Sequence, residues 1–424
     1  MKRKTWYPLD NAGKIYPPVS NIRRPSTFSL SAVLNEPVNR EVLERAVSEI
    51  LNRFASFNVK LKRGIFWYYL EENNKPFMVE EEPAYFLRYI DRNENNGYLF
   101  KVFFKGRRIT MVFFHALCDG TGALDVFKSL LYEYLLLSGK DVKPEDKITT
   151  CVTPYTLEES FDSFNVLDYK TKDKPIKEKS AFKTDGTNFK WDGCGIITGS
   201  VPVDQLKEEC KKYDATITEY LSGLFMYSIY LGFVKGKRVN NKIIKVLVPV
   251  NLRKFYPSHT LRNFAMFVRL GHDFEEEITF EECIEVCKTE LKKGLTKEKL
   301  DAQIWSNVKT EKNVFLKLVP LLIKDWVMAL AYKKVGDNLH TANLSNLGIV
   351  DLPISMREHI DNISFAIGTS FSTKNHMAVI SYNNQLNITF TREMVENNME
   401  KIFFRELSGR GINVKVSSNY WEGV

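Results

Sequence analysis

The chain has 424 residues, of which 44% are hydrophobic and 26% are charged. This length exceeds what one ordinary hydrophobic core serves, so a soluble globular protein of two or three domains is expected. Lysine and arginine (60) outnumber aspartate and glutamate (52) by a mild excess that is spread along the chain. The excess suits an anionic ligand. No block of basic residues interleaved with aromatic residues stands out, which argues against a nucleic-acid-binding protein.

The six cysteines show no Cys-x-x-Cys spacing, and no segment resembling a signal peptide precedes them. Reduced thiols and a cytoplasmic location are therefore expected. Cys283 and Cys287 share one helical face, yet no histidine or third cysteine lies close in sequence, and no bound metal is expected.

A period-two alternation of apolar residues predicts a first strand over residues 28–34. Asn39 is a typical cap for the helix that follows, whose apolar residues recur at helical spacing up to Leu51. Three further strands are expected over residues 65–71, 98–104 and 109–114. Beyond Gly120, apolar residues three and four apart predict a helix of about four turns.

Residues 140–190 are polar, lysine-rich and without periodicity, which indicates a linker or crossover between two halves, 1–170 and 190–424. The second half repeats the order of strands and helices. Strands are expected over 195–201, 243–250, 363–369, 377–382 and 386–390, and helices from 204, over 218–233, from 279 and over 393–407. The apolar stretch 314–332 contains three charged residues and a proline, so it predicts a buried or amphipathic helix without a membrane span, with peripheral lipid contact as an alternative.

The most informative motif joins the strand 109–114 to the following helix. His115 and Asp119 lie four residues apart at this junction, and Gly120 follows directly, permitting a close chain reversal. The pattern His-x-x-x-Asp-Gly resembles the active-site motif of the chloramphenicol acetyltransferase-like superfamily, which includes alcohol acyltransferases and condensation domains. The resemblance implies an α/β fold of two related subdomains, each a mixed sheet with flanking helices, with a tunnel between them.

An imidazole titrates near neutrality, so His115 suits the role of general base in acyl transfer. The resemblance implies direct attack in a ternary complex, without an acyl-enzyme, and an ion pair between Asp119 and an arginine. Arg253 is the first candidate, since residues 251–253 resemble the family's Asn-x-Arg stretch. Arg23 and Arg24 are the reserve candidates.

Two later segments extend the resemblance to bacterial alcohol acetyltransferase-like proteins: residues 257–264 and residues 343–348. The second segment resembles the Ser-Asn-x-Gly turn of that group, which implies a turn that borders the tunnel. Ser345 or Asn346 is expected to donate a hydrogen bond to the oxyanion, without a choice between them. Cys118 is expected to be inert, because only His115 lies close enough in sequence to lower the pKa of its thiol. Phe114 stands where condensation domains usually carry a second histidine, and the Asp-Phe-Gly-Trp-Gly stretch of the plant acyltransferases is missing.

The resulting hypothesis is an acyl-CoA-dependent acyltransferase without a bound cofactor. Its acceptor is a small alcohol or amine, with O-acyl transfer favoured over N-acyl transfer. One alternative replaces acyl-CoA by a carrier-protein thioester. Another is a catalytically silent member of the superfamily that binds an apolar ligand or a protein.

Overall fold

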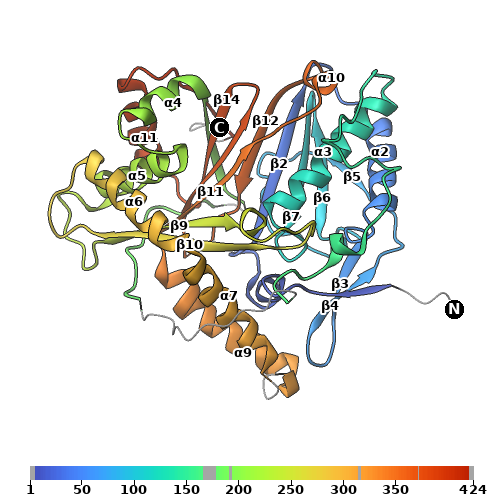
Figure 1. Ribbon diagram of the computed structural model, residues 1–424, viewed down its shortest axis with the longest axis horizontal. Helices are drawn as coiled ribbons and strands as arrows, with labels where there is room; N and C mark the ends of the chain where they lie inside the picture. The colour runs from blue at the N-terminus through green and yellow to red at the C-terminus, as the bar shows by residue number, and fades with distance from the viewer. Residues whose placement is uncertain (1–4, 166–177, 191–192, 314–316, 371, 420–424) are drawn as a thin grey trace.

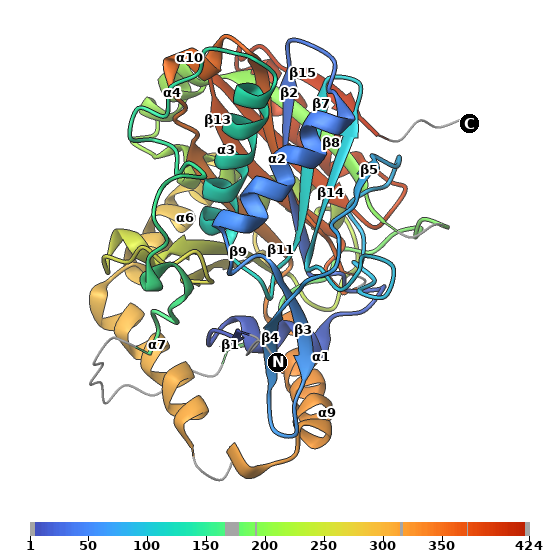
Figure 2. The same cartoon turned by 90° about the vertical axis from the view of Figure 1, so that its right-hand side faces the viewer.

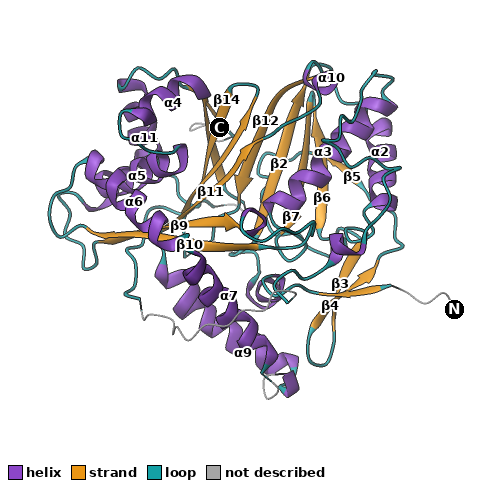
Figure 3. Cartoon of the chain, viewed as in Figure 1, coloured by secondary structure: helices purple, strands orange, loops and turns teal. Residues whose placement is uncertain are grey.

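The computed structural model describes residues 5–165, 178–190, 193–313, 317–370 and 372–419. Two mixed sheets lie side by side, and most helices cover their outer faces (Figures 1 and 3). The helices are α1 (Tyr16–Val19), α2 (Arg40–Arg53), α3 (Gly120–Leu137), α4 (Val203–Lys211), α5 (Ile217–Ile229), α6 (Phe280–Gly294), α7 (Lys297–Lys312), α9 (Leu321–Ala331), α10 (Ile354–Arg357) and α11 (Asn398–Gly409). The strands are β1 (Trp6–Pro8), β2 (Thr27–Leu34), β3 (Val59–Arg63), β4 (Tyr68–Glu72), β5 (Val79–Glu81), β6 (Phe100–Lys105), β7 (Arg108–Phe114), β8 (Gly195–Pro202), β9 (Ile243–Asn251), β10 (Ala265–Asp273), β11 (Ala342–Ile349), β12 (Ile360–Ile367), β13 (Asn375–Tyr382), β14 (Gln385–Arg392) and β15 (Lys415–Ser418).

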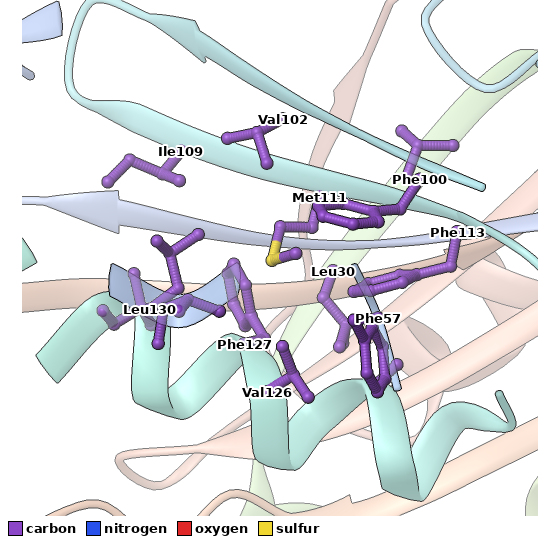
Figure 4. Packing of buried hydrophobic residues seen from close by; sticks show 14 of the residues in the cluster. Leu30, Phe57, Phe100, Val102, Ile109, Met111, Phe113, Val126, Phe127 and Leu130 are labelled. Carbon is purple, nitrogen blue, oxygen red and sulfur yellow. The ribbon is translucent and has the colours of Figure 1, made fainter. Parts of the chain in front are cut away.

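The N-terminal lobe contains a five-stranded sheet in the order β12-β2-β7-β6-β5, with α2 and α3 on its outer side. Val126, Phe127 and Leu130 of α3 pack against the buried side chains of β2, β6 and β7 (Figure 4). The edge strand β12 comes from the second half of the sequence and pairs antiparallel with β2. The division of the chain into halves 1–170 and 190–424 remains a prediction. In the structure, β12 from the second half completes a sheet whose other strands come from the first half.

The C-terminal lobe contains a seven-stranded sheet in the order β10-β9-β11-β13-β14-β8-β15, and β11 runs parallel to both β9 and β13. Helices α4, α5, α6 and α11 gather at the end of the molecule farthest from α2 and α3 (Figure 1). The hairpin of β9 and β10 reaches toward the N-terminal lobe, where the Asn251 side chain donates to Thr121 Oγ1 over 3.1 Å. This hairpin therefore joins the C-terminal lobe to the first turn of α3.

A third, three-stranded sheet in the order β1-β4-β3 projects from the N-terminal lobe, and α7 and α9 project beside it (Figure 2). By length and composition, only residues 217–234 among the described residues qualify as a membrane-spanning helix, and 61% of that window is buried inside the structure. This segment combines α5 with a π-helical turn, Tyr230–Val234, and contributes to the core of the C-terminal lobe.

The predicted elements are confirmed where capping and periodicity agree. The Asn39 side chain caps α2 and the Thr279 side chain caps α6. The strand predicted over 65–71 starts only at Tyr68, because a turn places Gly64 N–H on the Trp67 carbonyl. The helix predicted from 393 begins at Asn398, and the turn predicted within 343–348 is part of β11.

The predicted linker, residues 140–190, includes residues 166–177, which lie outside the described part of the chain. Part of the remainder packs on the protein. Glu159 forms a buried ion pair with Arg53, and its carbonyl accepts the backbone N–H of Leu261 over 2.9 Å. This segment therefore supports the loop that precedes β10.

Candidate active site

His115 directly follows β7, and its backbone N–H donates to the Ser26 carbonyl over 2.9 Å. The imidazole stacks on the Tyr16 ring at a centroid distance of 4.5 Å and meets the Phe28 ring edge-on at 5.1 Å. The side chain is half-buried. The strand end and two aromatic rings thus fix the orientation of the imidazole while leaving it partly accessible.

The buried side chain of Asn263 lies against this imidazole, with its Oδ1 3.0 Å from His115 Nδ1. Asn263 Nδ2 donates to Asp10 Oδ2 over 3.0 Å, and Asp10 Oδ1 accepts the Gly13 N–H over 2.6 Å. Because the Asp10 carboxylate holds the amide NH₂, the amide oxygen faces the ring. The network therefore assigns the proton to Nδ1 and leaves the lone pair on Nε2.

Desolvation by burial is the largest influence on His115 and lowers its pKa from the ordinary value of 6.5. A lowered pKa keeps the imidazole neutral at neutral pH, as a general base requires. Burial, and then the charge of Asp119, raises the pKa of the Cys118 thiol well above its ordinary value. The neighbouring Cys118 is thus a poor nucleophile, although it lies three residues from His115.

Asp119 caps α3, and its carboxylate points into the junction between the lobes. Oδ1 accepts the Gly122 N–H over 2.9 Å, while Oδ2 accepts from Arg253 Nη1 over 2.7 Å and from the Phe264 N–H over 2.8 Å. The arginine is the one that the sequence analysis ranked first. No hydrogen bond joins Asp119 to His115 within the described residues, so the geometry makes Asp119 a positioning residue.

Arg253 extends the same network, because its guanidinium also donates to the carbonyls of Thr260 and Arg262. It thereby fixes the loop that presents Asn263 to His115. The reserve candidate Arg24 instead pairs with Asp337. The bracing contacts thus connect the start of α3, the end of β9 and the start of β10.

Two glycines allow close approach at the start of α3. A Cβ atom on Gly122 would lie 2.1 Å from the Leu261 carbonyl oxygen, and a Cβ atom on Gly120 would lie 2.6 Å from Leu347 Cδ2. Both distances are too short for non-bonded atoms. Gly120 therefore leaves room for the Leu347 side chain of β11, and Gly122 lets the backbone of the loop before β10 approach the motif.

Ser345 and Asn346 lie on β11, where alternation sends their side chains to opposite faces. Asn346 Nδ2 donates to Thr218 Oγ1 of α5 over 3.1 Å, and its Oδ1 accepts the Gly348 N–H over 2.8 Å. Its side chain thus stabilises the C-terminal lobe. Ser345 faces away from α5, and no side-chain hydrogen bond engages it within the described part of the chain.

The sequence profile described as alcohol acetyltransferase matches residues 163–406, more than half of the chain. The chain belongs to the alcohol acetyltransferase family. This match includes Arg253, Asn263 and Ser345, whereas His115 and Asp119 precede it. A comparison with curated proteins found no match.

Solved structures show the same fold. The structure of F. sporotrichioides TRI101 complexed with coenzyme A and T-2 is 12% identical, with a TM-score of 0.62 over 98% of this chain and 100% of that chain. Polyketide synthase associated protein 5 from Mycobacterium tuberculosis is 13% identical, with a TM-score of 0.60 over 96% and 98%. The starter condensation domain of rhizomide synthetase RzmA is 11% identical, with a TM-score of 0.52 over 96% of each chain. These similarities confirm the predicted two-lobed α/β fold.

The structure brings His115, Asp119, Gly120 and Arg253 to one junction between the lobes. The prediction from sequence assigned no role to Asn263, although this residue lies within the segment 257–264 that carries part of the resemblance. It also missed Asp10, which is 105 residues before His115 in the chain. A local motif carries no signal for such a distant partner. In the described residues, no group of three or more histidine, cysteine or acidic side chains is placed to hold a metal ion.

Proposed function

We propose that this member of the alcohol acetyltransferase family transfers an acyl group from acyl-CoA to a hydroxyl acceptor, with His115 as general base. The observation that carries the proposal is the Asn263 amide oxygen 3.0 Å from His115 Nδ1. This contact assigns the basic lone pair to Nε2. The ternary complex would form between the two lobes, where the half-buried side chain of His115 lies.

In the proposed reaction, His115 Nε2 takes the hydroxyl proton of the acceptor as its oxygen attacks the thioester carbonyl. The positive charge that develops on the imidazole is stabilised by Asn263 Oδ1, which accepts the Nδ1–H. The tetrahedral intermediate then breaks its carbon–sulfur bond. The departing CoA thiolate receives the proton from Nε2, which restores the neutral imidazole and leaves an ester and free thiol.

Ser345 is our proposed donor to the oxyanion of this intermediate. Asn346 donates through Nδ2 to Thr218, whereas the Ser345 hydroxyl faces away from α5. A fixed donor of this kind typically contributes about 3 kcal/mol to transition-state stabilisation. Ser345 is therefore the better of the two candidates.

A hydroxyl acceptor fits the proposed chemistry better than an amine. An alcohol oxygen is a weak nucleophile until a base removes its proton, whereas a neutral amine attacks with its own lone pair and loses its proton later. A neutral imidazole with a lowered pKa thus serves the alcohol most directly. One structural neighbour, TRI3 trichothecene 15-O-acetyltransferase from Fusarium sporotrichioides, is also named for O-acyl transfer.

The test incubates the purified protein with acyl-CoAs of graded chain length and a panel of alcohols and amines, and measures free thiol together with product mass. We expect thiol release that depends on both substrates and yields an ester. In a second arm, the same acyl groups are loaded on the phosphopantetheine arm of a carrier protein. Faster turnover with that donor would identify a carrier-protein thioester, in place of acyl-CoA, as the acyl donor. Ligand binding without thiol release would identify a catalytically silent member of the family.

A further inference from the structure

Helix α9 exposes an apolar face that no described part of the chain covers. Trp326 is 67% exposed and Leu322 is 69% exposed. At about 100° per residue, the five exposed apolar residues of this helix fall within an arc of about 140°. These residues are Leu322, Ile323, Trp326, Val327 and Leu330.

The opposite face of α9 holds the turn between β3 and β4. The Leu321 N–H donates to the Ile65 carbonyl over 2.8 Å, and Lys324 Nζ donates to the Phe66 carbonyl over 3.0 Å. Asp325 accepts from Arg63 and from the Tyr68 hydroxyl, both over 2.9 Å. These contacts fix the turn against the helix.

The same turn exposes Ile65 and Phe66. We use the name apolar tip for these two residues at the end of the hairpin together with Leu318 and the exposed apolar residues of α9. Both views show α9 and the β3–β4 hairpin projecting together from the body of the two sheets (Figures 1 and 2). The apolar tip consists of Ile65, Phe66, Leu318, Leu322, Ile323, Trp326, Val327 and Leu330.

Basic side chains accompany the apolar tip. The two acidic residues of the segment 309–334 already have basic partners, Asp325 in Arg63 and Glu311 in Lys14. By contrast, four exposed lysines of the segment 309–334 have no carboxylate partner within the described residues. They are Lys309, Lys312, Lys317 and Lys334.

We propose that the apolar tip docks onto an anionic lipid bilayer. The aliphatic side chains would enter the boundary between headgroups and acyl chains, and the amphipathic indole of Trp326 suits the headgroup level. The unpartnered lysines complement the negative charge of the lipid surface. With 11 residues, α9 is about 16 Å long and too short to span a bilayer, so it would lie on the surface.

A second copy of the chain fits this surface less well. An isologous dimer through the apolar tip would bring together two sets of lysines without supplying a carboxylate to either set. Docking onto lipid also relates to the candidate active site, because α9 packs on α1, whose Tyr16 stacks on His115. Helix α1 therefore connects α9 to the candidate base.

The test is co-sedimentation of the full chain with phosphatidylcholine vesicles, with and without phosphatidylglycerol. We expect binding to the anionic vesicles that weakens as salt is added. The double variant Leu322→Ser/Trp326→Ser should lower the partition coefficient at least about ten-fold, because it removes two large apolar contacts with the lipid. Both residues are exposed, so the variant should keep the circular dichroism spectrum of the wild type.

The matched control is Ile354→Ser/Val416→Ser, which removes exposed apolar residues on α10 and β15 and should bind lipid as the wild type does. Wild-type protein that ignores anionic vesicles would overturn the proposal. So would a dimer, measured by light scattering, that the tip variant dissociates while vesicle binding stays unchanged. This experiment needs no substrate, so its result is independent of the proposed acyl transfer.

Discussion

Replacing Asp119 by alanine should destabilise the junction between the lobes. The carboxylate is 6% exposed and accepts three hydrogen bonds: from Gly122, from Arg253 and from Phe264. Loss of an N-cap typically costs about 1 kcal/mol. Breaking a buried ion pair on one side costs about 3–5 kcal/mol, since one charge stays buried.

These costs are not additive, and Arg253 keeps the carbonyls of Thr260 and Arg262 as acceptors. We therefore expect Asp119→Ala to lower the free energy of unfolding by about 3–5 kcal/mol in total. Asp119→Asn should be nearly as damaging. With its oxygen on the Gly122 N–H, the new NH₂ would face two donors, Arg253 and the Phe264 N–H.

The assay is equilibrium denaturation in urea, monitored by far-UV circular dichroism, as a double-mutant cycle with Arg253→Leu. Removing both partners should cost less than the sum of the single variants, because neither charge is left uncompensated. A destabilisation below about 1 kcal/mol for Asp119→Ala would refute the bracing role. Strict additivity in the cycle would show that the two side chains do not stabilise each other.

Three other outcomes follow from the structure. Gly122→Ala should lower the free energy of unfolding by at least about 3 kcal/mol, because the new Cβ would lie 2.1 Å from the Leu261 carbonyl oxygen. The helical control Gly409→Ala, whose Cβ would have nothing within 4 Å, should be neutral or stabilising, and equal unfolding midpoints for the two variants would contradict this. In the pH profile of kcat/KM, the midpoint of the acidic limb should lie below 6.5, because burial lowers the pKa of His115 and only the neutral imidazole is a base. A midpoint above 6.5 would exclude His115 as the general base. Burial lowers the pKa of His376 to about 3, so the free energy of unfolding should fall by up to about 1.4 kcal/mol per pH unit as the pH drops from 6.5 toward 3. His376→Gln should flatten this slope in urea titrations at several pH values, and identical slopes for variant and wild type would contradict the prediction.

The sequence predicted the parts of the site that lie within one local motif. His115, Asp119 and Gly120 were singled out by the resemblance to a family motif, and periodicity predicted the helix that follows them. The structure has α3 starting at Gly120 with Asp119 as its N-cap. Arg253 could be chosen because its segment follows an apolar strand and resembles the family's Asn-x-Arg stretch. Long-range pairing beyond such landmarks leaves no periodic signal, which explains why Asn263 received no role.

In the fold, too, local patterns were predicted from the sequence and long-range pairings were not. Strands with clear alternation, such as β2 and β7, were placed within a residue or two. β10 was not predicted, although it pairs with β9 along its whole length. The addition of β12 to the N-terminal sheet also depends on tertiary pairing, which the order of elements does not reveal.

The central claim is that His115 Nε2 removes the proton of the acceptor. Its most direct test compares kcat/KM for acceptor-dependent thiol release by the wild type, His115→Ala and Cys118→Ala, on the best substrate pair from the panel. The account predicts a loss of about 10²–10⁴-fold for His115→Ala, with an unchanged circular dichroism spectrum, and only a small change for Cys118→Ala. A His115→Ala enzyme that turns over at the wild-type rate would contradict it.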